Sequence, residues 1–436
     1  MAADLAREAA LSALERCRRS GAWSSASIDE AIREYGLDQR ARALTSAICL
    51  GVLQNMRLCD YVIDGLVGGR KLEPKVRDIL RTAVYQLLFM DRIPASAAVN
   101  EAVALSKKLG YQRASGLVNA VLRKVADGGR TLPEITAANE AEILSIRYSH
   151  PVWLAEKLLK EYGRDFTESF FAANNAAADT AIQINTLKIS TGDYLALLGK
   201  NDIAAQRHEW MPDCLLVKGS VTALPGYEDG LFYVQDPAAK ASILAAGLTP
   251  GMSVLDACAA PGGKSFAAAI AMQNEGSILS RDLHEKKLRL IKEGSERLGF
   301  SVITVKAADA RAESDGEFDA VIADVPCSGL GVIRKKPEIR FKTAQEIADL
   351  PEIQTAILQK LSESVKPGGV LIYSTCTVLR EENEDIIRAF LKTRDDFVPE
   401  DFTLPNGLAS RDGHLTLWPH INGTDGFFTA KLRRIR

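Results

Sequence analysis

The stretch that decides the fold is Ser253–Lys264, SVLDACAAPGGK, where an apolar strand runs into a turn of small residues and then into a helix. Four more apolar segments of strand type follow it: SILSRD (277–282), VITVKA (302–307), DAVIAD (319–324) and VLIYST (370–375). Strands that alternate with helices predict a parallel, doubly wound, Rossmann-like α/β sheet. We expect the helices after Lys264, Leu283 and Thr343, the last with a capping box made by Thr343 and Glu346.

The rest of the chain divides by pattern. At roughly 150 residues per domain, 436 residues predict about three domains. Helical periodicity throughout predicts an all-α bundle over 1–130, and DGGRTLPE (127–134) is a turn-rich linker. Mixed patterns predict a small α+β domain over 135–240, and the doubly wound domain takes 241–436.

Helix signals in the bundle are local and specific. Ser27 and Glu30 form an SxxE capping box, and Asp38 is placed to cap the next helix. After Pro74 an apolar stripe with helical spacing predicts the core helix of this bundle; it contains Val76, Ile79, Leu80, Ala83, Val84, Leu87 and Leu88.

Net charge, cysteine spacing and the length of apolar runs restrict the partners, the compartment and the membrane attachment that we expect. Lys plus Arg number 54 against 56 Asp plus Glu, so the net charge of -2 does not indicate a polyanionic partner. Whether the protein binds nucleic acid therefore depends on local basic patches. Seven cysteines without CxxC spacing predict a reduced, cytoplasmic protein with no metal site. Because apolar runs fall short of ~18 residues, we expect no membrane span or signal peptide. The oligomeric state is open, with a monomer as the default.

The turn after the first strand predicts a cofactor loop, because ligands of doubly wound folds bind at the carboxyl ends of the strands. It matches neither GxGxxG nor GxxxxGK[ST], which weighs against dinucleotides and nucleoside triphosphates. Asp282 ends the second strand, where an acid takes ribose hydroxyls, and Asp309 after the third is placed for an adenine edge. A structural turn and two helix caps are the alternative, but the register of all three favours a nucleoside cofactor. S-adenosylmethionine fits better than a nicotinamide.

Two cysteines follow the fourth and fifth strands. ADVPCSGLG (323–331) and YSTCT (373–377) bring Cys327 and Cys376 to one rim of the sheet. Either alone is more often a small buried hydrophobe than a nucleophile. Methylation at carbon 5 of cytosine needs such a pair, because a thiolate must first add to carbon 6. Asp324 is the candidate carboxyl for the ring nitrogen, and the second cysteine is a candidate for the release step.

These strings resemble a known family. DACAAPGGK, DVPCSGLGVIRKKPEIRF and YSTCTVLREENE are similar to the motifs of the RNA (cytosine-5)-methyltransferase family, a match that covers about residues 145–436. The helical front resembles the NusB-type antitermination-factor domain. YSHPVWL (148–154), VQDPA (234–238) and HINGTDGFF (420–428) are similar to further family segments. The resemblance implies methylation of a specific cytosine in small-subunit ribosomal RNA.

The resemblance also implies residue roles. Cys376 would be the nucleophile, Cys327 would assist product release, and Asp324 would orient the base and border the cofactor. The S-adenosylmethionine site would comprise Cys258, Ala259, Ala260, Pro261, Gly262, Gly263, Lys264, Asp282, Asp309 and Asp324. Gln183 departs from the family, whose members carry Arg there, which puts one RNA-phosphate contact in doubt. Val325 replaces a commoner Ala, a change that leaves the catalytic assignment intact.

Basic residues next to the Cys327 turn are the expected RNA contacts, although a charge run is usually a solvated face. They are Arg334, Lys335, Lys336, Arg340 and Lys342. In the helical front, Arg7, Lys107, Lys108 and Arg113 are candidates, at even odds with a purely stabilising domain.

Three alternatives stay beside this interpretation. The same chemistry on transfer RNA would differ only in the RNA-side surfaces. A non-catalytic RNA-binding assembly factor is disfavoured by the intact Cys376, Cys327, Asp324 and cofactor loop. A DNA base amino-methyltransferase is expected to carry, after the fourth strand, an Asn or Asp followed by two prolines and an aromatic residue. Here Asp324 is followed by Val325, Pro326 and Cys327.

Overall fold

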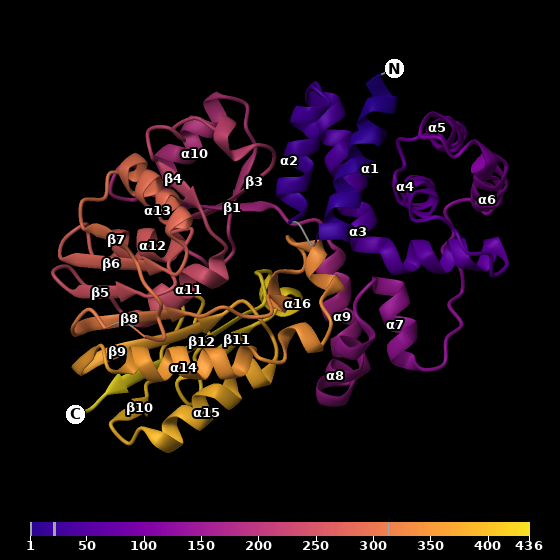
Figure 1. Cartoon of the computed structure of the whole chain (residues 1–436). Helices are drawn as coiled ribbons and strands as arrows, with labels where there is room; N and C mark the ends of the chain where they lie inside the picture. Colours follow the sequence, from indigo (N-terminus) through magenta and orange to yellow (C-terminus); the bar gives the residue numbers. More distant parts are fainter. Residues whose placement is uncertain (1, 21–22, 313) are drawn as a thin grey trace. The chain divides into compact units, whose positions relative to one another are not determined.

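The structure is a computed structural model that describes residues 2–20, 23–312 and 314–436 (Figure 1). The chain forms two compact units. The first comprises Met1–Ala176 and Ile333–Ala344, and the second comprises Ala177–Val332 and Gln345–Arg436. The borders of the three expected domains stay a prediction. The division between the two compact units near residue 176 falls inside the expected α+β range of 135–240.

The first unit is helical. Its helices are α1 (Ala2–Ser20), α2 (Ser24–Glu34), α3 (Gln39–Val67), α4 (Pro74–Phe89), α5 (Ala95–Lys108), α6 (Ser115–Asp127), α7 (Glu140–Tyr148), α8 (Val152–Tyr162) and α9 (Arg164–Asn175), with 3-10 turns at Gln112–Ala114 and Pro337–Phe341. The predicted apolar stripe of α4 is buried in the core. Asp38 caps α3 as predicted, because its side chain accepts a hydrogen bond from Ala41 N at 2.8 Å. The Ser27–Glu30 capping box is wrong, since α2 already begins at Ser24.

The second unit opens with a small antiparallel sheet in the order β2-β3-β1-β4. Its elements are β1 (Thr180–Ile184), α10 (Thr191–Lys200), β2 (Ala205–Arg207), β3 (Cys214–Val217) and β4 (Phe232–Val234), with a 3-10 turn at Val221–Ala223. One face of this sheet packs on α10 through Ile182, Tyr194, Leu198 and Phe232.

The large sheet follows, in the order β10-β12-β9-β8-β5-β6-β7, with β11 paired to β12. Its elements are α11 (Pro237–Ala246), β5 (Ser253–Asp256), α12 (Gly263–Ala271), β6 (Ser277–Asp282), α13 (Glu285–Leu298), β7 (Ile303–Ala307), β8 (Phe318–Asp324), α14 (Leu350–Ser362), β9 (Val365–Thr375), α15 (Glu384–Thr393), β10 (Phe397–Pro399), β11 (His414–Leu417), α16 (Pro419–Asn422) and β12 (Phe427–Arg434), with 3-10 turns at Leu330–Val332, Gln345–Ile347 and Arg380–Glu382. The helix expected directly after Thr343 begins later, because a 3-10 turn forms at Gln345–Ile347 and α14 begins only at Leu350.

Strands β5 to β9 are parallel neighbours, and β10, β11 and β12 run antiparallel to theirs. Alternate strand residues enter two cores: Val254 packs toward α11, α12 and α13, whereas Leu255 packs toward α14 and α15 (Figure 1). The predicted Rossmann-like sheet is therefore confirmed, with an antiparallel edge. The strand order reverses at β5, which pairs with β6 on one side and β8 on the other. Such a switch point opens a crevice at the carboxyl ends of the strands.

Among the described residues, no helix combines the length and apolar character that a membrane crossing requires. Within the same ranges, no cluster of three or more His, Cys, Asp or Glu side chains is arranged to hold a metal ion.

Candidate active site

The turn between β5 and α12 is shaped by its small residues. Gly262 has a left-handed φ of 112°, and a Cβ there would lie 2.6 Å from the Phe266 ring, so only glycine fits without a shift. Ala259 N donates to Arg281 O at 2.7 Å, which ties the turn to β6. The first backbone N–H groups of α12 therefore lie at the carboxyl edge of the sheet, as polar donors without helical partners of their own.

Two predicted acids follow the next strands. Asp282, largely buried at the end of β6, accepts hydrogen bonds from Ala260 N at 3.3 Å and His284 N at 3.0 Å. Its carboxylate therefore borders the turn between β5 and α12 that the sequence predicts to hold a cofactor. Asp309 lies after β7 and pairs with Arg311 at 2.7 Å, and this hydrogen bond lowers the pKa of Asp309.

Asp256 is a buried acid that sequence reasoning did not assign. Its Oδ2 accepts a hydrogen bond from Ser265 Oγ at 2.6 Å, whereas Oδ1 is buried without a partner. Burial raises the pKa of Asp256 to about 7, and the neighbouring carboxylates of Asp324 and Asp282 add to this effect. The available signal was an acid that closes an otherwise apolar strand.

The two predicted cysteines meet. Cys327 Sγ and Cys376 Sγ are 3.3 Å apart, because β8 and β9 are parallel neighbours that end at the same edge. Both residues are partly accessible. The Cys376 sulfur and burial raise the pKa of Cys327 well above its ordinary value, which favours the protonated thiol at Cys327.

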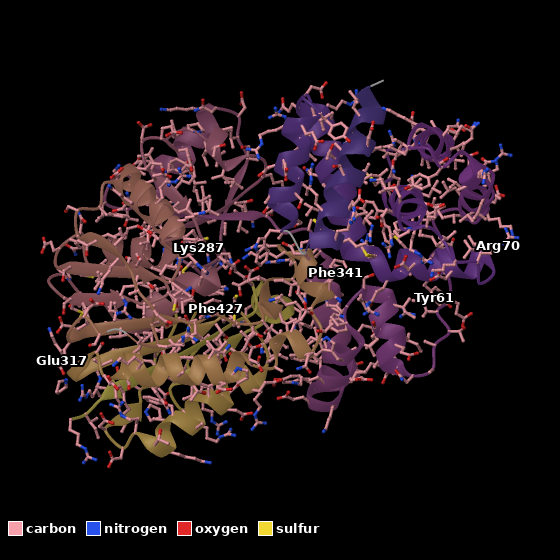
Figure 2. The ribbon with its side chains drawn as sticks, in the orientation of Figure 1. Tyr61, Arg70, Lys287, Glu317, Phe341 and Phe427 are labelled. Carbon is pink, nitrogen blue, oxygen red and sulfur yellow. The ribbon has the colours of Figure 1, made fainter. Side chains whose placement is uncertain are left out.

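Asp324 ends β8 beside this pair. Its Oδ1 accepts a hydrogen bond from Ser374 Oγ at 2.9 Å, and its Oδ2 pairs with Lys264 Nζ at 2.7 Å. The Lys264 ammonium also lies 4.9 Å from the centre of the Phe427 ring, which is labelled in Figure 2. The sequence placed Lys264 in the cofactor loop and did not reveal that it pairs with the candidate catalytic acid.

A buried glutamate supports the Cys327 turn. Glu382 is 1% exposed, and its carboxylate accepts hydrogen bonds from Ser328 N at 2.8 Å, Gln354 Nε2 at 2.9 Å and Thr377 Oγ1 at 3.1 Å. Sequence reasoning missed Glu382, because within the charged run REENE it reads like a solvated residue.

A second support comes from close backbone contacts. Gly331 N donates to Cys376 O at 2.9 Å, and Gly426 N donates to Gly331 O at 2.8 Å. A Cβ on Gly331 would lie 1.9 Å from Gly426 O, so no larger residue fits. The turn that carries Cys327 is thus tied directly to Cys376 and to the strand-entry segment before β12.

The predicted RNA contacts divide by accessibility. Lys335 and Lys336 are exposed, and Arg334 and Lys342 are half-buried. Arg340 is a correction: it is 2% exposed and donates hydrogen bonds to backbone carbonyls inside the helical unit, so it cannot reach a phosphate. In the sequence Arg340 stands close to other basic residues, which predicted an accessible side chain, but the fold buries it.

The other RNA candidates also differ. Arg7 is buried and donates to Gln86 Oε1 at 2.8 Å, so it too has a structural role. Lys107 and Arg113 are exposed, and Lys108 pairs with Glu8 at 2.6 Å. Gln183 is fully buried and donates to Gln235 O at 2.9 Å, an internal contact that does not reach a phosphate.

The fold and this edge define a class of protein. A switch-point turn without a dinucleotide pattern, strand-end acids and a paired thiol are the features of a Rossmann-like methyltransferase, and the comparisons agree. Residues 244–433 match the family described as 16S rRNA methyltransferase RsmB/F, residues 4–127 match the NusB family, and residues 150–223 match the ferredoxin-like domain of RsmF/B-like methyltransferases.

Relatives match the chain along nearly its whole length. A Bacillus subtilis protein named "Probable ribosomal RNA small subunit methyltransferase B" is 34% identical over 98% of both chains, and the Pseudomonas putida ribosomal RNA small subunit methyltransferase B is 34% identical over 92% of both. The crystal structure of PH0851 is 28% identical, covers 99% of both chains and has a TM-score of 0.82. This chain belongs to the RsmB/F family of methyltransferases, with the NusB-like front that the sequence predicted.

Proposed function

We propose that this protein transfers a methyl group from S-adenosylmethionine to carbon 5 of a specific cytosine in small-subunit ribosomal RNA, through a covalent adduct with Cys376. The observation that carries the proposal is the 3.3 Å pair of Cys327 and Cys376 sulfurs, beside the acid Asp324. Methylation at an amino nitrogen or a hydroxyl oxygen needs no such pair, since those atoms are already nucleophilic.

The residues at the switch point fit the proposed cofactor. Small side chains at Ala259, Ala260 and Gly262 allow a ligand to approach the backbone, and the Asp282 carboxylate is suited to ribose hydroxyls. Asp309 would face the base of the nucleoside. When bound, S-adenosylmethionine supplies an electrophilic methyl group.

Cys376 would start the reaction. Its sulfur forms a bond to carbon 6 of the flipped cytosine, and the electron pair of the 5,6 double bond moves toward the ring nitrogen, which makes carbon 5 nucleophilic. Cys376 is the better candidate because its sulfur and burial raise the pKa of Cys327, which disfavours a Cys327 thiolate. The Lys264–Asp324 pair would stabilise the charge that develops on the pyrimidine ring.

Cys327 would act after methyl transfer. The proton on carbon 5 passes to a water molecule, its electron pair re-forms the 5,6 double bond, and the bond from carbon 6 to the Cys376 sulfur breaks to release a thiolate. Cys327 would give its proton to the departing thiolate, and the distance of 3.3 Å between the two sulfurs supports this role. The names of the relatives support ribosomal RNA as substrate, and exposed Lys335 and Lys336 are the proposed phosphate contacts.

Two cysteine variants test the mechanism. Cys376→Ala should give neither methylated RNA nor adduct, because carbon 5 is never activated. Cys327→Ala should accumulate a protein–RNA complex that survives denaturation, because attack is possible and release is impaired. The measurement is gel electrophoresis after incubation with S-adenosylmethionine and RNA, with the double variant as the control that forms no complex.

The substrate is identified in parallel by bisulfite sequencing of ribosomal and transfer RNA from cells with and without the protein. Loss of one protected cytosine in small-subunit RNA is the expected result. A lost site in transfer RNA would reassign the substrate. An adduct from Cys376→Ala but not from Cys327→Ala would exchange the two roles, and full activity in both variants would contradict the two-thiol mechanism.

A further inference from the structure

The segment Ile333–Ala344 links the Cys327 turn to the helical unit. Cys327 and Val332 belong to the second unit, whereas Ile333–Ala344 packs within the first unit, and the chain returns at Gln345. The residues directly after the candidate catalytic turn are therefore held by α-helices of the NusB-like front and of the region α7–α9.

Arg340 is the centre of this attachment. Its Nη1 donates to Gln54 O at 2.9 Å and to Tyr148 O at 3.0 Å, and its Nη2 donates to Asn174 O at 3.0 Å. In the part of the chain that the structure describes, the guanidinium forms no ion pair. An arginine stays charged when buried, and because its Nε is buried without a partner, these three carbonyls are the hydrogen-bond acceptors of the charged group.

The three carbonyls are available for a physical reason. Tyr148 ends α7 and Asn174 lies in the last turn of α9, where carbonyls lack helical partners and the helix dipole favours a cation. Gln54 lies in α3 just before the non-helical Asn55. There Leu58 N donates to Ser149 Oγ at 3.3 Å, which leaves the Gln54 carbonyl open to Arg340.

Neighbouring residues of the segment are held as well. Glu338 accepts hydrogen bonds from Ser24 N at 3.2 Å and Ser24 Oγ at 2.7 Å, at the start of α2. Lys336 Nζ lies 5.1 Å from the centre of the Trp23 ring. Trp153 Nε1 donates to Lys342 O at 3.1 Å, next to the exposed Phe341 that Figure 2 labels.

We propose that Arg340 is a positioning residue for the methyl-transfer reaction: by fixing Ile333–Ala344 on the helical unit, it holds the turn that carries Cys327. The catalytic consequence rests on the proposed function, whereas the positioning itself does not. The helical front would thus contribute to catalysis by holding Ile333–Ala344, in addition to any contact with RNA.

Hydrogen exchange tests the positioning without reference to activity. In Arg340→Gln the amides of the Cys327 turn, among them Gly331 N and Val332 N, should exchange about tenfold faster, which corresponds to about 1.4 kcal/mol of local stability. Arg340→Lys keeps the charge with fewer directed donors and should be intermediate. It also carries the test if the glutamine variant fails to fold.

The matched control is Arg81→Gln, another buried arginine of the same unit. Arg81 donates to Asp60 Oδ1 at 2.8 Å, to Asp60 Oδ2 at 2.6 Å and to Asp78 Oδ1 at 2.8 Å, and no partner belongs to Ile333–Ala344. It should lower the melting temperature and leave exchange in the Cys327 turn unchanged. Equal acceleration in both glutamine variants, or none in the Arg340 variants, would overturn the proposal.

Adduct lifetime gives the catalytic readout. Arg340→Gln should prolong the protein–RNA adduct several-fold, as expected for Cys327→Ala, with unchanged affinity for S-adenosylmethionine. An adduct lifetime equal to that of the unaltered protein would contradict the catalytic role of Arg340. If exchange accelerates while no form of the protein methylates RNA, the proposed function fails and the positioning of the turn stands.

Discussion

At the scale of single residues, neighbouring acids of the candidate site differ in what surrounds their carboxyl groups. Asp282 accepts two backbone N–H groups and lies beside the cofactor turn, whereas Asp256 is enclosed and has one oxygen without a partner. Enclosure favours the neutral form of a carboxyl group, and burial accordingly raises the pKa of Asp256. Asp282 borders the turn between β5 and α12 and is the proposed partner of ribose hydroxyl groups, whereas Asp256 accepts a hydrogen bond from Ser265 in the first turn of α12 and stabilises that turn from the protein interior.

Removal of the Asp282 side chain should weaken cofactor binding. Hydrogen bonds to a charged group contribute roughly 1.5–3 kcal/mol, so Asp282→Ala should raise the Kd for S-adenosylmethionine by about 10- to 150-fold. Calorimetry measures this change. Asp319→Ala is the control, because Asp319 lies near the start of β8, at the opposite edge of the sheet, and pairs with Lys366. Unchanged affinity in Asp282→Ala would remove Asp282 from the site.

Asp256 should make stability depend on pH. Its folded pKa of about 7 lies above the unfolded value of about 3.9, so the folded state binds the extra proton. Its contribution to stability is therefore fully present below pH 4 and is lost as pH rises toward 7, by on the order of 4 kcal/mol. Asp256→Asn cannot titrate, so its melting temperature relative to the unaltered protein should rise between pH 5 and pH 8. Parallel curves for the two proteins would contradict the assignment.

At the scale of elements, hydrophobic periodicity predicted the helices and strands whose buried residues recur at a regular spacing. Strands β5 to β9 lie where the apolar runs indicated, and their order brings Cys327 and Cys376 together. The start of α2 could not be predicted locally, because the Glu338 carboxylate from a distant segment accepts from Ser24 N and favours the positive end of that helix. The local SxxE pattern therefore did not predict the first residue of α2, which this tertiary contact stabilises.

The same limit explains the misassigned basic residue. Arg334, Lys335, Lys336 and Arg340 read as one charge run, yet the chain changes unit after Val332 and buries Arg340 among helix ends. The helix expected after Thr343 also starts later than predicted, since the chain returns to the sheet unit at Gln345 and forms a 3-10 turn before α14 begins. Lys264–Asp324 and the Glu382 contacts join residues far apart in sequence, so no local spacing could reveal them.

At the scale of the whole molecule, charge sets how RNA must be recognised. The net charge of -2 gives no general attraction for a polyanion, and the proposed contacts after the Cys327 turn are two exposed lysines, Lys335 and Lys336. Affinity should therefore depend on salt through a small number of phosphate contacts, with a slope of about 0.7 log units for each contact on single-stranded RNA.

Replacing Lys335 and Lys336 together should separate local from global charge. If both contact phosphates, the double alanine variant should flatten the plot of log affinity against log salt by about 1.4 and weaken binding at low salt. The matched control replaces Lys286 and Lys287, exposed on α13, with Lys287 labelled in Figure 2, and removes the same charge. Because the two variants share one net charge, a change in slope confined to the first locates RNA on the segment after the Cys327 turn. Equal slopes in both would assign Lys335 and Lys336 to a solvated face, and the RNA path would lie elsewhere.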